Sequence, residues 1–253
     1  MFGLLQRFTK SAGRAAAVPP GQRVYAIGDV HGCRAELDRL LDQIDSDCES
    51  GPGEAHLVFV GDVVDRGPDS AGVVERLLSG NLPCHRHSFL MGNHEEAMLA
   101  AWDGDTETLQ GWLTYGGRET LESYGIERAE TFRRGPEIIS RMHASVPPQH
   151  IELIRSFQDQ VRVGGYLFVH AGIRPGVPLP QQDSYDLRWI RDEFLLDGET
   201  DHGVVVVHGH TISEEPEIRN NRIGIDTGCF ASGRLTALVL EGTKRRFLST
   251  STR

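Results

Sequence analysis

A chain of 253 residues with 39% hydrophobic and 25% charged residues has enough apolar side chains to form one large globular domain. Its formal net charge of -10 at pH 7 excludes a general affinity for nucleic acid, because such binding needs an excess of Lys and Arg against the phosphates. Any attraction for phosphate must therefore be local.

The first 22 residues contain basic but no acidic side chains, together with a short apolar patch. The patch is too short for a secretory signal or a membrane span. We expect residues 1–22 to form a flexible tail that ends at Pro19-Pro20-Gly21, with no stable membrane association. The chain contains no Cys-x-x-Cys pair, so neither a structural zinc site nor a disulfide framework is expected, and reduced thiols favour a cytoplasmic location.

Seven apolar runs rich in β-branched residues are predicted to be strands. They cover residues 23–27, 56–60, 87–91, 166–169, 204–207, 222–225 and 235–240. Helical patterns separate the first three runs, which predicts parallel strand-helix-strand units. The later runs have short, glycine-rich connections and fewer helices, which is typical of a second, mixed sheet. The expected fold is α/β, with two packed mixed sheets flanked by helices.

Residues 96–160 have a different character, being helical in pattern and aromatic until Pro147-Pro148. This segment is too apolar for a linker. We interpret it as a helical cap beside the functional site, inserted within a domain of residues 23–253. Simple packing over a sheet edge is an equally good interpretation of the same pattern.

Polar motifs follow most of the predicted strands directly. Three of them read Gly28-Asp29-Val30-His31-Gly32, Gly61-Asp62-Val63-Val64-Asp65-Arg66-Gly67 and Gly92-Asn93-His94-Glu95, and later strands end at His170, at Gly209-His210-Thr211 and at Asp226-Thr227-Gly228. Any one Asp or His could cap a helix or begin a turn. Their repeated occurrence at strand ends, where α/β sheets place their ligand sites, indicates instead a metal-dependent phosphatase.

In this order, the motifs GD-x-HG, GD-x-x-DRG and GNHE resemble the signature of the phosphoprotein phosphatase family of calcineurin-like metallophosphoesterases. The similarity runs from about Val24 to Leu240 and is greatest to bacterial members and the phosphatase of bacteriophage lambda. It implies the metallophosphoesterase fold, an α-β-β-α sandwich. Two departures, Met91 where many relatives carry Arg and the absence of a long carboxy-terminal extension, leave any regulatory partner unknown.

The resemblance also implies a centre with two divalent metal ions. The first ion would be held by Asp29, His31 and Asp62, and the second by Asp62, Asn93, His170 and His210. Such ligands suit Mn²⁺, with Fe or Zn²⁺ as alternatives. A carboxylate shared by two cations offsets their repulsion, and a water between them becomes acidic enough to attack phosphorus at neutral pH.

By the same resemblance, His94 is the general acid that protonates the leaving alkoxide, and Asp65 orients it. Arg66, Arg191 and Asn93 would bind the substrate phosphate, since guanidinium groups match phosphate oxygens in geometry and charge.

Three further residues lie close in sequence to the candidate site residues. Arg188 lies close to Arg191 in the sequence, and either residue could form an ordinary salt bridge. His208 is expected to be a buried histidine beside the ligand His210, and Asp226 to lie near the metals without clearly ligating them.

Three functions fit these residues. The first is a serine/threonine protein phosphatase that hydrolyses phosphomonoesters, with tyrosine phosphate or small phosphoesters as further substrates. The alternative is a symmetrical dinucleoside tetraphosphate hydrolase, in which the cap recognises nucleobases through Trp102, Trp112 or Tyr115. A non-catalytic metal-binding scaffold is disfavoured, because it would have no use for an acid, its orienting carboxylate and a phosphate ligand.

Overall fold

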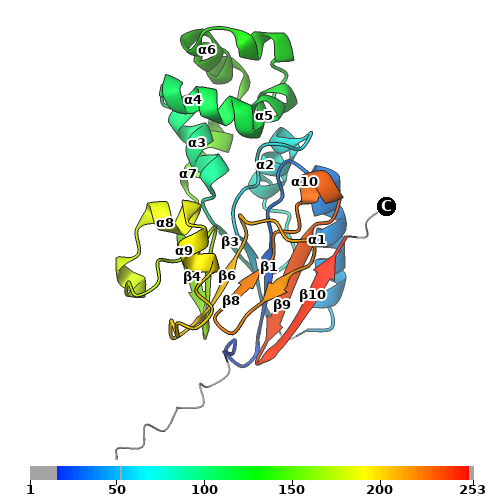
Figure 1. Ribbon diagram of the computed structural model, residues 1–253. Helices are drawn as coiled ribbons and strands as arrows, with labels where there is room; N and C mark the ends of the chain where they lie inside the picture. The colour runs from blue at the N-terminus through cyan, green and yellow to red at the C-terminus, as the bar shows by residue number, and fades with distance from the viewer. Residues whose placement is uncertain (1–15, 52, 251–253) are drawn as a thin grey trace, which may run out of the picture.

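The computed structural model describes residues 16–51 and 53–250, which form two packed sheets beneath a layer of helices (Figure 1). The first sheet has the order β10-β9-β1-β2-β3, with β1 (Gln22–Ile27), β2 (Glu54–Phe59), β3 (Arg86–Phe89), β9 (Thr236–Glu241) and β10 (Lys244–Ser249). Strands β1, β2 and β3 run parallel to one another, whereas β9 and β10 are antiparallel to their neighbours.

The second sheet is also mixed and has the order β4-β5-β6-β8-β7. It comprises β4 (Gln160–Val163), β5 (Tyr166–Val169), β6 (Val205–His208), β7 (Glu217–Ile218) and β8 (Arg222–Gly224). Strands β5, β6 and β8 are parallel, and β4 and β7 pair antiparallel at the two edges.

Strand alternation divides the apolar side chains between two cores. Val24 and Ala26 of β1 face the second sheet, whereas Tyr25 and Ile27 face the outer helices. The outer helices of the first sheet are α1 (Arg34–Cys48) and α2 (Ser70–Leu78), and the second sheet is covered by η3 (Leu179–Gln181), α8 (Ser184–Trp189) and α9 (Asp192–Leu195). Two mixed sheets flanked by helices confirm the expected fold class.

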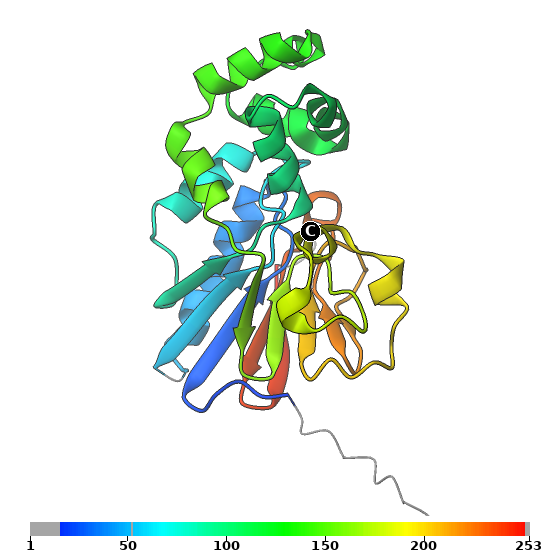
Figure 2. The same ribbon diagram turned by 90° about the vertical axis from the view of Figure 1, so that its left-hand side faces the viewer.

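Residues 96–160 contain most of the helical layer drawn in green in Figures 1 and 2, which stands at one end of the sheets. Its elements are α3 (Asn93–Trp102), α4 (Thr106–Trp112), the kinked segment η1 (Leu113–Gly117), α5 (Arg118–Ser123), η2 (Arg128–Phe132), α6 (Gly135–Ser145) and α7 (Pro148–Arg155). Pro148 occupies the first turn of α7, where its missing N–H costs nothing. Met98, Leu109 and Leu121 join the core under α1 and α2, so these helices are packed onto the sheet domain.

Residues 16–21, which were predicted to belong to a flexible tail, are packed against the domain. Residues 1–15 lie outside the described residues, but Val18 is buried between the sheets, and its N–H donates to the carbonyl of Gly242 at 2.9 Å. The N–H of Gly165 donates to Ala17 at 2.9 Å. Burial of the Val18 side chain and these two backbone bonds hold residues 16–21 against both sheets.

No helix among residues 16–51 and 53–250 is long and apolar enough to cross a membrane.

Candidate active site

The predicted motifs lie at one edge of the sandwich, because they follow the carboxyl ends of the parallel strands in both sheets. The backbone there is strained. His31, Asp62, Asp65, Arg66 and His210 all have φ between 46° and 74°, a region that side chains other than glycine rarely adopt. Such strain costs about 1–3 kcal/mol per residue and collects at functional sites.

The six predicted metal ligands converge around the buried carboxylate of Asp62. Its Oδ2 atom lies 3.6 Å from His31 Nε2 and 3.4 Å from His170 Nε2. The same His170 nitrogen lies 3.0 Å from Asn93 Oδ1 and 3.1 Å from His210 Nδ1. Asp29 lies beside the same group, since its Oδ2 accepts the backbone N–H of His210 at 3.0 Å.

The hydrogen bonds of the histidines show how their lone pairs point. His31 Nδ1 lies 2.8 Å from the carbonyl of Val64, and His170 Nδ1 lies 2.9 Å from that of Val60. A carbonyl can only accept, so each ring carries a proton on Nδ1 and, in its neutral form, presents the Nε2 lone pair to the cluster. Imidazole ligands of metals are typically oriented by such bonds.

The buried donor atoms suit a bound cation. Burial lowers the pKa of His31 to about 3 and that of His210 to about 2, so both rings are neutral. Burial, together with the charges of Asp226 and Asp62, raises the pKa of Asp29 well above its ordinary value. His210 Nε2 is buried and has no partner among the described residues. Carboxylates, imidazoles and an amide oxygen therefore converge where burial disfavours the negative charge of Asp29 and the positive charges of His31 and His210. This donor set fits divalent metal ions.

His94 and Asp65 form a buried pair beside the cluster, with His94 Nδ1 2.6 Å from Asp65 Oδ2. Burial alone would lower the pKa of His94, but the charge of Asp62 and the hydrogen bond and charge of Asp65 outweigh it and raise the pKa to about 9. The Arg66 guanidinium contacts both His31 and His94, with Nη1 2.9 Å from His31 Nε2 and Nη2 3.0 Å from His94 Nε2. An imidazole and a guanidinium thus border the metal ligands.

Residues 22–231 match the family described as calcineurin-like phosphoesterase. The chain belongs to this family. Its members use a dinuclear divalent metal centre, which agrees with the donor set around Asp62.

The curated relatives of this phosphoesterase include proteins named Bis(5'-nucleosyl)-tetraphosphatase PrpE [asymmetrical]. The one from Bacillus thuringiensis (strain Al Hakam) is 27% identical over 231 residues, covering 84% of this chain and 88% of its own. The one from Halalkalibacterium halodurans is 29% identical over 223 residues, covering 84% and 87%. The family expectation is thus confirmed at the level of calcineurin-like phosphoesterases, whereas the specific resemblance to phosphoprotein phosphatases and the lambda enzyme is not what these relatives show.

Solved structures give the same fold. A crystal structure provisionally described as a diadenosine tetraphosphatase has a TM-score of 0.63 and 24% identity, and the match covers 95% of this chain and 100% of that one. A cold-active protein-tyrosine phosphatase from a psychrophilic Shewanella has a TM-score of 0.55 and 18% identity, with 97% and 86% covered. At these identities the two likenesses establish the fold alone.

The structure separates the two arginines near α8. Arg188 is paired with Glu96 at 2.7 Å and Asp159 at 2.5 Å. Arg191 is exposed at the start of α9, and its charge helps to lower the pKa of His210 after burial and His170. Of the two arginines, Arg191 is thus the exposed one near His210, and its binding of phosphate stays a prediction.

His208 and Asp226 lie close to the metal ligands. His208 is buried against Phe194, with ring centroids 5.3 Å apart, and its Nδ1 lies 3.0 Å from the carbonyl of Gly209. Asp226 is buried, and its Oδ1 accepts the N–H of Gly228 at 2.8 Å. Neither side chain belongs to the groups of converging ligand atoms around Asp62.

The three cap aromatics that were expected to recognise nucleobases have different surroundings in the structure. Trp112 is only 3% exposed, and its indole N–H points at Asp65, so it cannot stack on a ligand. Trp102 packs its ring on His143, with centroids 4.4 Å apart. Tyr115 is 69% exposed. Trp112 is therefore excluded from base contact, and Tyr115 is the most exposed of the three.

Sequence reasoning did not assign a role to Glu95 or Phe230. Phe230 of α10 (Cys229–Ser232) lies under the Arg66 guanidinium, 4.9 Å from ring centroid to Cζ, and packs edge-on against His31. Glu95 is fully buried and accepts four backbone N–H groups, from Asp62 and Gly92 on Oε2 and from Val63 and Val64 on Oε1. Its place as the fourth residue of the GNHE motif was the available signal.

We expect Glu95→Gln to destabilise the phosphoesterase by about 1–3 kcal/mol, because an amide nitrogen would face N–H donors that now meet a carboxylate oxygen. Urea unfolding of metal-free protein measures this change. Glu96→Gln is the matched control: Glu96 is half-exposed and ion-paired with Arg188, so its replacement should cost less than about 1 kcal/mol. Equal stability of the two variants would show that Glu95 does not hold the Asp62 loop.

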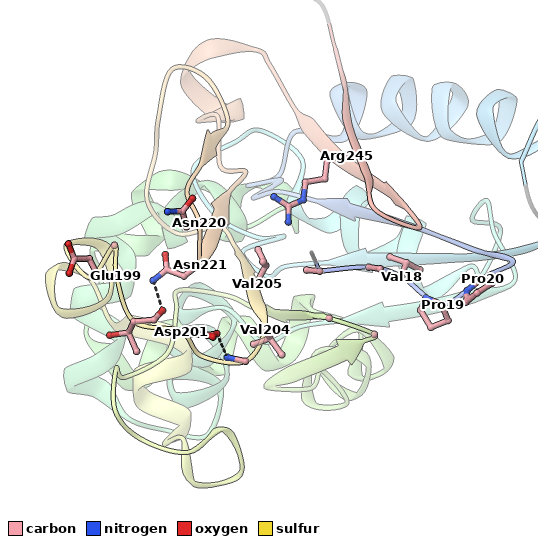
Figure 3. A pocket seen from close by; sticks show the side chains of 17 residues that line it. Val18, Pro19, Pro20, Glu199, Asp201, Val204, Val205, Asn220, Asn221 and Arg245 are labelled. Carbon is pink, nitrogen blue, oxygen red and sulfur yellow. Dashed lines mark hydrogen bonds between the residues drawn. The ribbon is translucent and has the colours of Figure 1, made fainter. Parts of the chain in front are cut away.

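A cavity of about 1220 Å³ lies away from this chemistry (Figure 3). Its lining includes Gly165, Val204 and Asn221, each of which directly precedes a parallel strand of the second sheet. The catalytic motifs follow those same strands. The cavity is therefore at the opposite end of the sandwich and takes no part in the site.

Proposed function

We propose that this phosphoesterase hydrolyses dinucleoside tetraphosphates, with two divalent metal ions held by Asp29, His31, Asp62, Asn93, His170 and His210. The convergence of these donors on Asp62 supports phosphoester hydrolysis. The names of relatives that align with 84% of the chain support the choice of substrate. Mn²⁺ is the proposed native metal, with Fe and Zn²⁺ as the other ions that this donor set accepts.

Metal ions bound at these residues would supply a water of lowered pKa and positive charge for the phosphate oxygens. The protein's own side chains bind the phosphate and deliver the proton. Arg66 and Arg191, with the amide of Asn93, bind and orient the phosphoryl oxygens. His94, held by Asp65 through Nδ1, delivers a proton from Nε2 to the leaving oxygen.

An exposed apolar rim beside the phosphate ligands supports a nucleoside substrate. Phe230 is 38% exposed next to Arg66, and Ile212, two residues after His210, is 51% exposed. The two side chains lie on neighbouring segments, because Ile212 packs against Gly228, which directly precedes the helix α10 that carries Phe230. Aromatic and aliphatic surfaces of this kind suit the face of a nucleobase.

Hydrolysis of phosphoserine or phosphothreonine is a second candidate, favoured by the His94–Asp65 pair. An alkoxide leaving group depends on a proton donor more than a nucleotide phosphate does, and this pair is built to supply one. The expected symmetrical cleavage gives way in our proposal to asymmetrical cleavage, in keeping with the relatives' names.

Turnover of diadenosine tetraphosphate and of a phosphothreonine peptide, measured side by side with Mn²⁺, tests this choice. We expect kcat/KM to be at least about tenfold higher for the dinucleotide, because the peptide leaves the apolar rim unused. Chromatography should show ATP and AMP as products, where symmetrical cleavage would give ADP alone. Faster turnover of the peptide would refute the dinucleotide proposal and establish the phosphatase.

A further inference from the structure

One face of the cap docks on the loop that carries Asp65 and Arg66. Trp112, Gly116, Thr120 and Ser123 follow one another at helical intervals along α4, η1 and α5, and we name them the docking face. Each makes a hydrogen bond to residues 65–71: Trp112 Nε1 and Thr120 Oγ1 donate to Asp65, Arg66 N donates to the carbonyl of Gly116, and Ala71 N donates to Ser123 Oγ.

Two of these bonds fix the carboxylate that orients His94. Asp65 is completely buried, and Trp112 Nε1 lies 2.7 Å from its Oδ2, the oxygen that also holds His94 Nδ1. Thr120 Oγ1 lies 2.6 Å from Oδ1 and 2.9 Å from the Asp65 N–H. Since a hydroxyl has a single proton, Thr120 donates to the carboxylate and accepts from the backbone.

The backbone of the docking face is shaped for the same contact. The helix is interrupted at Tyr115 and Gly116, and Gly116 has φ 120°. A Cβ atom at this position would lie 2.7 Å from both Cγ and N of Arg66. Only glycine permits this close approach.

We propose that Trp112 and Thr120 are positioning residues for proton delivery, through Asp65 and His94, to the leaving group. The inference rests on the proposed phosphoester hydrolysis. Both oxygens of a buried carboxylate need donors, and without the two cap donors Asp65 would have to turn or move to satisfy them. His94 would then lose the 2.6 Å bond that aims its Nε2 at the leaving oxygen.

The dependence of kcat on the leaving group distinguishes a positioning role from a purely structural one. Phenyl phosphate has a poor leaving group that needs an acid, whereas dinitrophenyl phosphate has a good one that does not. We expect Trp112→Phe and Thr120→Val to lower kcat on phenyl phosphate about tenfold to a hundredfold, a part of what general acid catalysis supplies, and on dinitrophenyl phosphate less than about threefold.

Controls separate positioning from damage to the cap. Trp102→Phe makes the same chemical change in the cap away from Asp65 and should leave both substrates at wild-type rates. Thr120→Ser keeps the hydroxyl and should restore most of the loss in Thr120→Val. In metal-free protein, the Nδ1 proton resonance of His94 should shift in Trp112→Phe and stay in place in Trp102→Phe.

An equal loss on both phosphates, with an unmoved His94 resonance, would overturn the positioning role. If Trp112→Phe does not fold, Thr120→Val carries the same comparison. Wild-type protein that hydrolyses neither phosphate nor the dinucleotide would instead remove the proposed function, which is a different and recognisable failure.

Discussion

Asp62→Asn should abolish phosphoester hydrolysis, with a loss of more than about a thousandfold in kcat, because one carboxylate serves both metal positions and metal catalysis supplies several kcal/mol of transition-state stabilisation. Asp62 Oδ2 is the atom that His31 and His170 both approach. An amide there would remove the negative charge that offsets the repulsion between two cations. Hydrolysis of dinitrophenyl phosphate with Mn²⁺ measures the effect without involving the general acid.

The control for Asp62→Asn is Asp42→Asn on the exposed side of α1, which removes the same charge far from the site. It should retain wild-type activity. The metal content of each variant after dialysis reports whether binding or only catalysis is lost. Wild-type turnover by Asp62→Asn would contradict a shared carboxylate.

His94→Asn should lower kcat on phenyl phosphate by about a hundredfold to ten-thousandfold, the range that general acid catalysis supplies. The Nδ1 bond to Asp65 and the proximity of Nε2 to Asp62 place the ring between its orienting carboxylate and the metal ligands. The loss on dinitrophenyl phosphate should be much smaller, since that leaving group departs without a proton.

His143→Asn, an exposed change on α6, controls for the loss of an imidazole. Both variants should bind as much metal as the wild type, because the His94 side chain is not among the proposed ligands. A similar reduction of both aryl phosphate rates in His94→Asn would show that His94 supports the site in some way other than proton transfer.

The strands, and the convergence of the residues predicted as metal ligands, could be predicted because both leave local signals. Buried parallel strands read as continuous apolar runs, and the residues just after them must meet at one sheet edge. Asp29, Asp62 and His170 were therefore predictable as neighbours. The edge strands β4, β7 and β10 were missed, since charged residues such as those at the start of β10 mask the pattern, and edge strands favour charge.

The roles of Trp112 and Val18 could not be read from the chain, because they depend on tertiary contacts. An aromatic residue in a helical cap reads equally well as core or as a base platform, and only the docked structure shows its indole N–H against Asp65. Val18 follows an alanine-rich segment without periodicity, yet it fills a gap between two sheets whose packing involves distant residues. Local patterning carries no information about either partner.

The substrate was the least predictable feature, since one set of ligands can activate water against either a phosphomonoester or a phosphoanhydride. The residues that could distinguish these substrates lie on a loop and on the short helix α10. Phe230 and Ile212 are exposed beside the phosphate ligands, and their neighbours in sequence are the metal motifs themselves. Nothing in the sequence marks these two side chains, and only the structure shows Phe230 against Arg66 and Ile212 against Gly228.

Anomalous diffraction from crystals grown with Mn²⁺ tests the dinuclear centre most directly. We predict two manganese peaks about 3.5 to 4 Å apart, one on each side of Asp62, with Asp29 and His31 at the first and Asn93, His170 and His210 at the second. A single peak, or peaks away from Asp62, would contradict the account.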